Sequence, residues 1–203
     1  MLFPELAAYF AALPEPELER RAQLNTLAKE LRALREGEGK LALVFICTHN
    51  SRRSHMSQVL AQAAALHCGV ERIETYSGGT EATAFNPRAV AALRRAGVQI
   101  DAPAEPSDNP RYRVRYGPAS ASSEAWSKLW NDPANPAERF VALMTCGEAD
   151  EACPFIPGAA LRVPLRYEDP KLADDTPEEA ARYDARARQI AAEMLALMGA
   201  LSA

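Results

Sequence analysis

Apolar residues follow two different spacings along the chain, and the changes between them outline a series of helices and strands. Residues 1–38 have helical spacing and predict a short helix and a longer one, ended by Gly37 and Gly39. The compact apolar run at residues 41–46 then predicts a buried strand, and residues 54–68 predict a helix. The central part of the chain therefore begins with strand, loop and helix.

The same alternation continues toward the C-terminus. Residues 73–77 predict a second strand, and Pro87 opens the helix that follows it. Residues 140–146 predict a third strand. Residues 160–165 predict a fourth, which either lies at an edge of the sheet or ends near Pro164, because proline has no N–H to donate.

Two further segments complete the pattern. The C-terminal helix is expected to begin with Thr176 as its cap and Pro177 as its first residue. Residues 101–137 are irregular and rich in proline, with a strand expected at residues 112–116 and a short helix at residues 124–130. We expect this segment to be an elaboration of the core.

Alternating strands and helices are typical of a parallel sheet covered on both faces. We therefore predict a three-layer α/β/α domain with a mainly parallel four-stranded sheet at residues 39–203, preceded by a helical extension at residues 1–38. The extension has no catalytic cluster. It serves either core packing or a homodimer formed through residues 1–38.

Composition narrows the function classes. The 203 residues are 48% hydrophobic and 25% charged, as in a globular protein with one main domain. The net charge is −4 and basic residues are dispersed, which argues against nucleic acid and membrane surfaces as partners. Without a signal peptide or an apolar run of roughly 20 residues, the chain is expected to be cytoplasmic. Its four cysteines are then buried, metal-bound or reactive.

Residues 47–54, Cys-Thr-His-Asn-Ser-Arg-Arg-Ser, form the segment with the clearest chemistry. The segment joins the end of a strand to the start of a helix, where free backbone N–H groups bind anions. A helix N-terminus and nearby cations lower the pKa of a thiol, so Cys47 is expected to be a nucleophilic thiolate. Arg53 can bind two oxygens of the same anion. The alternative is a chance match around a buried cysteine.

The remaining loop residues are expected to support this anion site. Asn50 tolerates a left-handed backbone conformation, and the Ser54 hydroxyl can donate to the thiolate sulfur. The expected oxyanion-binding residues are Thr48, His49, Asn50, Ser51, Arg52, Arg53 and Ser54.

The loop and its setting resemble the low-molecular-weight protein tyrosine phosphatase family, whose signature is C-x5-R followed by Ser after the first strand. The resemblance covers roughly residues 40–200 and implies catalytic roles for Cys47 and Arg53. The family usually has Gly in place of His49, which must accept the backbone angles of that position. The family often has a second Cys in place of Arg52. In this chain the Arg52 side chain either adds positive potential at the loop or faces solvent.

The resemblance also implies a general acid from an Asp-Pro pair late in the chain. Asp169-Pro170 matches this pair, and its carboxyl group would protonate the leaving oxygen. Glu168 is the neighbouring rival. The alternative is a simple turn with an aspartate before proline.

Cys146 and Cys153 flank a strand-to-helix loop that resembles the thioredoxin-coupled arsenate reductases, where two such cysteines resolve the intermediate formed on the first. The resemblance implies that Cys146 attacks Cys47, that Cys153 attacks Cys146, and that a thioredoxin-like protein reduces the final disulfide. The intervening helical turn must then partly unwind. Inert burial and a partial zinc site are the alternatives, although the spacing is wrong for zinc. Cys68 is interpreted as structural.

Tyrosine phosphatases of the family carry aromatic residues after the Asp-Pro pair, whereas this chain has Lys171 and Leu172, unless Tyr116 or Tyr167 supplies the wall. The preferred hypothesis is therefore an arsenate reductase that acts on a small oxyanion, releases arsenite and needs no metal or organic cofactor. The runner-up is a phosphatase of tyrosine-phosphorylated protein or aryl phosphate, whose later cysteines protect Cys47 from overoxidation. A non-enzymatic oxyanion sensor is the third hypothesis.

Overall fold

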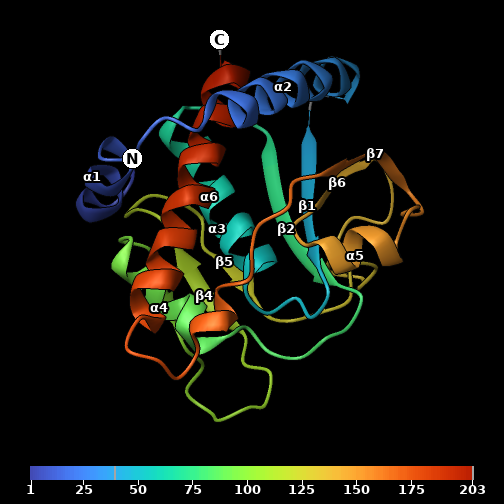
Figure 1. The fold of residues 1–203 in the computed structure, drawn as a ribbon. Helices are drawn as coiled ribbons and strands as arrows, with labels where there is room; N and C mark the ends of the chain where they lie inside the picture. The colour runs from blue at the N-terminus through green and yellow to red at the C-terminus, as the bar shows by residue number, and fades with distance from the viewer. Residues whose placement is uncertain (39, 203) are drawn as a thin grey trace.

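A parallel four-stranded sheet forms the centre of the computed structural model, which describes residues 1–38 and 40–202 (Figure 1). The strands are β1 (Leu41–Cys47), β2 (Ile73–Gly79), β6 (Phe140–Met144) and β7 (Ala159–Pro164). Their order is β2-β1-β6-β7, with parallel pairing throughout. The predicted fold class is confirmed, and the strand that contains Pro164 lies at an edge as expected.

Helices cover both faces of this sheet (Figure 1): α3 (Arg53–His67), with α6 (Glu179–Ser202) packed on it, lies on one face and α5 (Gly147–Ala152) on the other. The helix α4 (Pro87–Arg95) packs against α6. Successive side chains of β1 point to opposite faces of the sheet. Leu43 and Phe45 belong to the large core shared with α3 and α6, whereas Val44 and Ile46 belong to a smaller cluster shared with α5. Among the described residues, none of the helices combines the length and apolar character needed to cross a membrane.

The N-terminal extension consists of α1 (Pro4–Ala11) and α2 (Leu18–Glu38), and both helices pack against α6 (Figure 1). Their apolar stripe is used inside the chain itself, since Leu6, Phe10 and Leu27 are buried in the large core. The helical spacing of residues 1–38 therefore reflects core packing. The homodimer through this extension stays a prediction. Gly39, expected to end α2, lies outside the described residues.

The segment at residues 101–137 contributes to a second, antiparallel sheet: β3 (Gln99–Asp101), β4 (Tyr112–Arg115) and β5 (Ser123–Ala125). The strand expected at residues 112–116 is confirmed, but the helix expected at residues 124–130 is wrong. Its backbone is used elsewhere: β5 pairs with β4, Ser127 N bonds Asn109, and Gly79 N bonds the Lys128 carbonyl. These tertiary hydrogen bonds outweigh the local helical preference.

The connection from β7 to α6 passes through the Asp-Pro pair and a 3₁₀ turn, η1 (Pro170–Ala173). The start expected at Pro177 is two residues too early, because α6 begins at Glu179. The Thr176 hydroxyl does not cap the helix but donates to the Ala173 carbonyl. The Glu179 carboxylate accepts from Asp175 N and pairs with Arg88, which closes the turn before α6.

Candidate active site

Residues 47–54, named here the anion loop after their predicted role, leave the sheet at the end of β1, directly beside the end of β2. Cys47 is paired with Gly79 in the parallel register. A Cβ atom at Gly79 would lie 2.6 Å from the Thr48 carbonyl oxygen and 2.7 Å from Asn50 N. Only glycine therefore permits the loop to pack this closely against β2.

Three side chains of the loop form a hydrogen-bonded chain that ends at the Cys47 sulfur. Lys128 N donates to Asn50 Oδ1 at 2.9 Å, which directs the amide nitrogen of Asn50 toward Ser54 Oγ, also at 2.9 Å. Ser54 Oγ lies 3.0 Å from Cys47 Sγ. Because Ser54 already accepts from Asn50, its own hydrogen is directed to the sulfur. This arrangement is the one that stabilises a thiolate.

Residues of the 101–137 segment hold the loop from outside. Ser127 Oγ donates to the His49 carbonyl at 3.0 Å, and the neighbouring Lys128 N–H orients Asn50. Thr83, which follows β2, also donates to the His49 carbonyl. These residues are not recognisable from the sequence, because no local pattern indicates which distant segment reaches the loop.

The two departures from the family signature have different consequences. Asn50 takes a left-handed conformation with φ 43°, as expected, whereas His49 keeps a negative φ and needs no glycine-like backbone. The His49 ring instead lies 3.5 Å from the Glu81 carboxylate at the rim of the loop. Arg52 faces Asp169 rather than solvent, with Nε 2.9 Å from Oδ1. The second departure therefore adds a cation beside the Asp-Pro pair.

Asp169 lies between Arg52 and Arg53 at the mouth of the loop. Arg53 Nη2 is 2.9 Å from Asp169 Oδ2, and Arg53 Nη1 donates to the Tyr167 carbonyl at 3.1 Å. Burial favours the neutral acid, but Arg53, the Lys171 backbone N–H and Arg52 outweigh it and hold the pKa of Asp169 below its ordinary value. In this arrangement Asp169 is a carboxylate that acts as counter-ion to Arg53. Arg53 and the backbone N–H groups of the loop together are called the oxyanion clamp below, after their predicted role.

A cavity of about 10 Å³ remains inside the loop, about the room that one water molecule needs. It is lined by Cys47, His49, Ser51, Arg52, Arg53 and Asp169. A tetrahedral oxyanion is larger than water, so it would fit here only if Asp169 moved away from Arg53. Glu168, the rival to Asp169, points away and pairs with Arg186 on α6.

The aromatic side chains considered as a wall for a phenyl ring lie elsewhere. Tyr116 is buried with its hydroxyl 3.3 Å from Ser123, and Tyr167 is buried beneath Arg20. Leu172 is 84% exposed. Among the residues that line the described cavity, none is a tyrosine, phenylalanine or tryptophan.

Cys146 lies beside the anion loop because β6 runs parallel to β1, with Ile46 paired to Met144. Its sulfur is 3.5 Å from Thr48 Oγ1 and accepts a hydrogen bond from Ala149 N at the start of α5. Cys47 and Cys146 are buried in the same small cluster, and Cys153 packs against it from the far end of α5. One apolar cluster therefore contains Cys47 and Cys146 and is in contact with Cys153.

Salt bridges hold α5 between the two later cysteines. Asp150 is buried and pairs with Arg162 and Arg166, and Arg162 Nε also donates to the Cys153 carbonyl at 2.9 Å. Any movement of Cys153 toward Cys146 must break these contacts as α5 unwinds. The partial unwinding expected of this turn remains a prediction.

His55, in the first turn of α3, is completely buried and stacks on Phe85 with ring centroids 4.0 Å apart. Burial first, and Lys128 second, lower its pKa to about 3. The unfolded chain binds a proton below pH about 6.5, whereas folded His55 does not until about pH 3, so stability falls as the pH drops through this window.

We expect urea unfolding to show a loss of roughly 1–3 kcal/mol from this group between pH 7 and pH 4. His55→Phe should reduce that loss, because phenylalanine keeps the stacking without a proton to bind. His67→Phe is the matched control, since His67 also stacks on a phenylalanine but is exposed. Equal pH slopes for His55→Phe and wild type would contradict this account.

Comparisons with known proteins identify relatives of this chain. A model of the family described as low molecular weight phosphotyrosine protein phosphatase matches residues 42–113, which include the anion loop. The arsenate reductase of Bacillus licheniformis is 32% identical over 149 residues, 73% of this chain and 88% of that protein. The arsenate reductase of Bacillus subtilis is 30% identical over 146 residues, 72% of this chain and 86% of that protein.

A solved structure of a YwlE mutant from Bacillus subtilis shares the fold. It aligns with a TM-score of 0.53 and 15% sequence identity over 78% of this chain and 97% of that chain. The relatives are arsenate reductases and the matching family is one of phosphatases, so this chain is an enzyme. The chain belongs to the low-molecular-weight protein tyrosine phosphatase family, in the branch that contains the arsenate reductases.

Proposed function

We propose that this enzyme reduces arsenate to arsenite through a thiol relay of Cys47, Cys146 and Cys153. The observation that carries the proposal is the apolar cluster that joins the three cysteines, with Cys146 in contact with Thr48 of the anion loop. A phosphatase needs only the first of these cysteines. The similarity to two curated arsenate reductases points in the same direction.

Oxyanion binding uses the loop N–H groups and Arg53. Arg53 Nε is buried and, within the described part of the chain, has no hydrogen-bond partner, so one donor is ready for the anion. The anion replaces Asp169 as the partner of Arg53. Its negative charge then raises the pKa of the nearby Asp169 carboxyl, which takes up a proton. Asp169 becomes the acid that protonates the leaving oxygen.

Reduction of arsenic(V) to arsenic(III) takes two electrons, and two thiols supply them when they form one disulfide. The Cys47 thiolate attacks arsenic(V) and forms a sulfur–arsenic bond, and one arsenate oxygen leaves as water. The Cys146 thiolate attacks Cys47 Sγ, so the disulfide forms, the sulfur–arsenic bond breaks and arsenic keeps the electron pair as arsenite. Cys153 then attacks Cys146 and releases Cys47. A thioredoxin-like dithiol reduces the Cys146–Cys153 disulfide and restores the enzyme.

This cycle fits a reducing cytoplasm, where we place the enzyme. All four cysteines are free in the structure, as the start of the cycle requires. The chemistry of the relay comes from cysteine sulfur and an external dithiol, so the proposal includes no metal and no organic cofactor. The partners are a small oxyanion and the reductant.

An aryl phosphate phosphatase is the second candidate function, because the same loop binds phosphate and the Cys47 thiolate can form a phosphocysteine. Absence of a tyrosine, phenylalanine or tryptophan among the described residues that line the cavity disfavours a phenyl ring. A non-enzymatic oxyanion sensor is the third candidate and requires binding without turnover.

One assay separates the three candidates. Purified protein is given arsenate and reduced thioredoxin in one reaction and para-nitrophenyl phosphate in another, and arsenite and nitrophenol are measured. The reductase proposal expects arsenite at a rate well above that of aryl phosphate hydrolysis. Nitrophenol without arsenite would overturn it in favour of the phosphatase. Tight arsenate binding without either product would favour the sensor.

A further inference from the structure

The segment that joins β7 to the Asp-Pro pair is held on both sides. On one side it continues along β6, since Leu165 N donates to the Met144 carbonyl and Tyr167 N to the Thr145 carbonyl. The opposite carbonyls face α2 of the N-terminal extension. The Tyr167 carbonyl is the acceptor that holds Arg53.

Two side chains of α2 make these contacts with the segment. Arg20 Nη2 donates to the Arg166 carbonyl at 2.7 Å, and Gln23 Nε2 donates to the Pro164 carbonyl at 2.8 Å. The Arg20 guanidinium also lies over the Tyr167 ring, 5.6 Å from its centroid. The extension therefore contacts both the backbone and the side chain that place the acceptor of Arg53.

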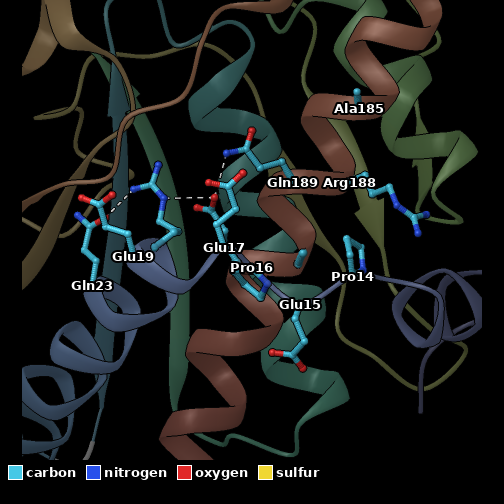
Figure 2. A pocket seen from close by; sticks show the side chains of 12 residues that line it. Pro14, Glu15, Pro16, Glu17, Glu19, Gln23, Ala185, Arg188 and Gln189 are labelled. Carbon is cyan, nitrogen blue, oxygen red and sulfur yellow. Dashed lines mark hydrogen bonds and ion pairs between the residues drawn. The ribbon is translucent and has the colours of Figure 1, made fainter.

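Arg20 is itself fixed by a buried carboxylate on α6. Its Nε lies 3.3 Å from Glu193 Oε1, and Gln189 Nε2 donates to the same oxygen at 3.0 Å. Arg20 and Glu193 line a groove of about 700 Å³ between α2 and α6. Gln23 and Gln189, labelled in Figure 2, line the same groove from α2 and α6. Glu193 is 3% exposed, so the ion pair with Arg20 compensates a charge that lies inside the protein.

We infer that Arg20 is a positioning residue for the oxyanion clamp, acting through Tyr167 on Arg53. This role rests on the proposed function only in that the anion loop must bind an oxyanion. The planar guanidinium contacts the Glu193 carboxylate, the Arg166 carbonyl and the Tyr167 ring at once, which a lysine ammonium cannot do. Loss of this fork lets the segment shift and moves the Tyr167 carbonyl away from Arg53.

The test measures the affinity of the full-length protein for inorganic phosphate by isothermal titration. Arg20→Gln is expected to raise the dissociation constant about tenfold, since small displacements of a positioning group cost up to about 100-fold. Arg20→Lys keeps a positive charge beside Glu193, so it should fold and show a smaller increase. Arg21→Gln is the matched control, because Arg21 is the next residue of α2 and pairs with the exposed Glu15.

The titration separates positioning from stability. A purely structural role would lower the number of binding sites per chain and leave the dissociation constant unchanged, whereas loss of position raises the dissociation constant at full stoichiometry. Equal dissociation constants for wild type, Arg20→Lys and Arg21→Gln would overturn the inference, even if Arg20→Gln failed to fold. Absence of phosphate binding by the wild type would overturn the proposed function together with it.

Discussion

Replacing Cys47 by serine is expected to abolish both arsenite release and aryl phosphate hydrolysis, by at least roughly 10⁴-fold, the scale seen when an enzyme loses its nucleophile. Serine is a much weaker nucleophile than a thiolate at neutral pH. It also cannot form the disulfide with Cys146. Both reactions require the sulfur at the end of β1, so they fall together.

Phosphate binding should survive in Cys47→Ser, because the loop N–H groups and Arg53 remain. Titration with inorganic phosphate therefore shows whether the variant is folded and the clamp intact. Cys68→Ser is the matched control: Cys68 is a half-buried cysteine whose sulfur faces the Leu195 carbonyl at 4.0 Å, away from the loop. Activity retained by Cys47→Ser would remove this residue from the mechanism.

Replacing Cys146 by serine is expected to reduce single-turnover arsenite release to background, while aryl phosphate hydrolysis stays within about twofold of wild type. The arsenic adduct on Cys47 then has no second thiol to accept the disulfide bond. The fold should tolerate the change, because Cys146 is the N-cap of α5 and serine is among the preferred N-cap residues. Rapid quench with arsenite detection provides the measurement.

Cys153→Ser refines this result because it interrupts the following step. One equivalent of arsenite should appear, since the Cys47–Cys146 disulfide can still form, but repeated turnover with thioredoxin should stop. If Cys146→Ser releases arsenite at the wild-type rate, the relay is wrong and another reductant must act directly on the arsenic adduct.

The supersecondary pattern of this chain was readable because each element has a strong local signal. The four parallel strands and the helices between them follow from short apolar runs and helical spacing, and all appear in the structure. The errors occurred where local signals were overruled. Residues 124–130 have helical composition but pair with β4 and the anion loop, and the cap expected at Thr176 was replaced by a turn closed by Glu179 and Arg88.

The N-terminal extension shows the same limit from the opposite side. Its amphipathic spacing indicated helices with one apolar face, which is correct, but spacing does not name the surface that covers that face. The structure places the stripe of α1 and α2 on α6. The contact between Arg20 and the Arg166 carbonyl joins residues 146 positions apart and has no sequence signal.

Local sequence was sufficient to predict an anion site at Cys47, Asn50, Arg53 and Ser54, because one strand, one turn and one helix N-terminus bring these residues together without help from the rest of the chain. Tertiary packing was needed to show that Asp169 lies between Arg52 and Arg53, that Cys146 reaches Thr48, and that α2 supports Arg53 through Tyr167. Those contacts depend on how separate strands and helices are placed side by side. Residue spacing along the chain does not encode that placement.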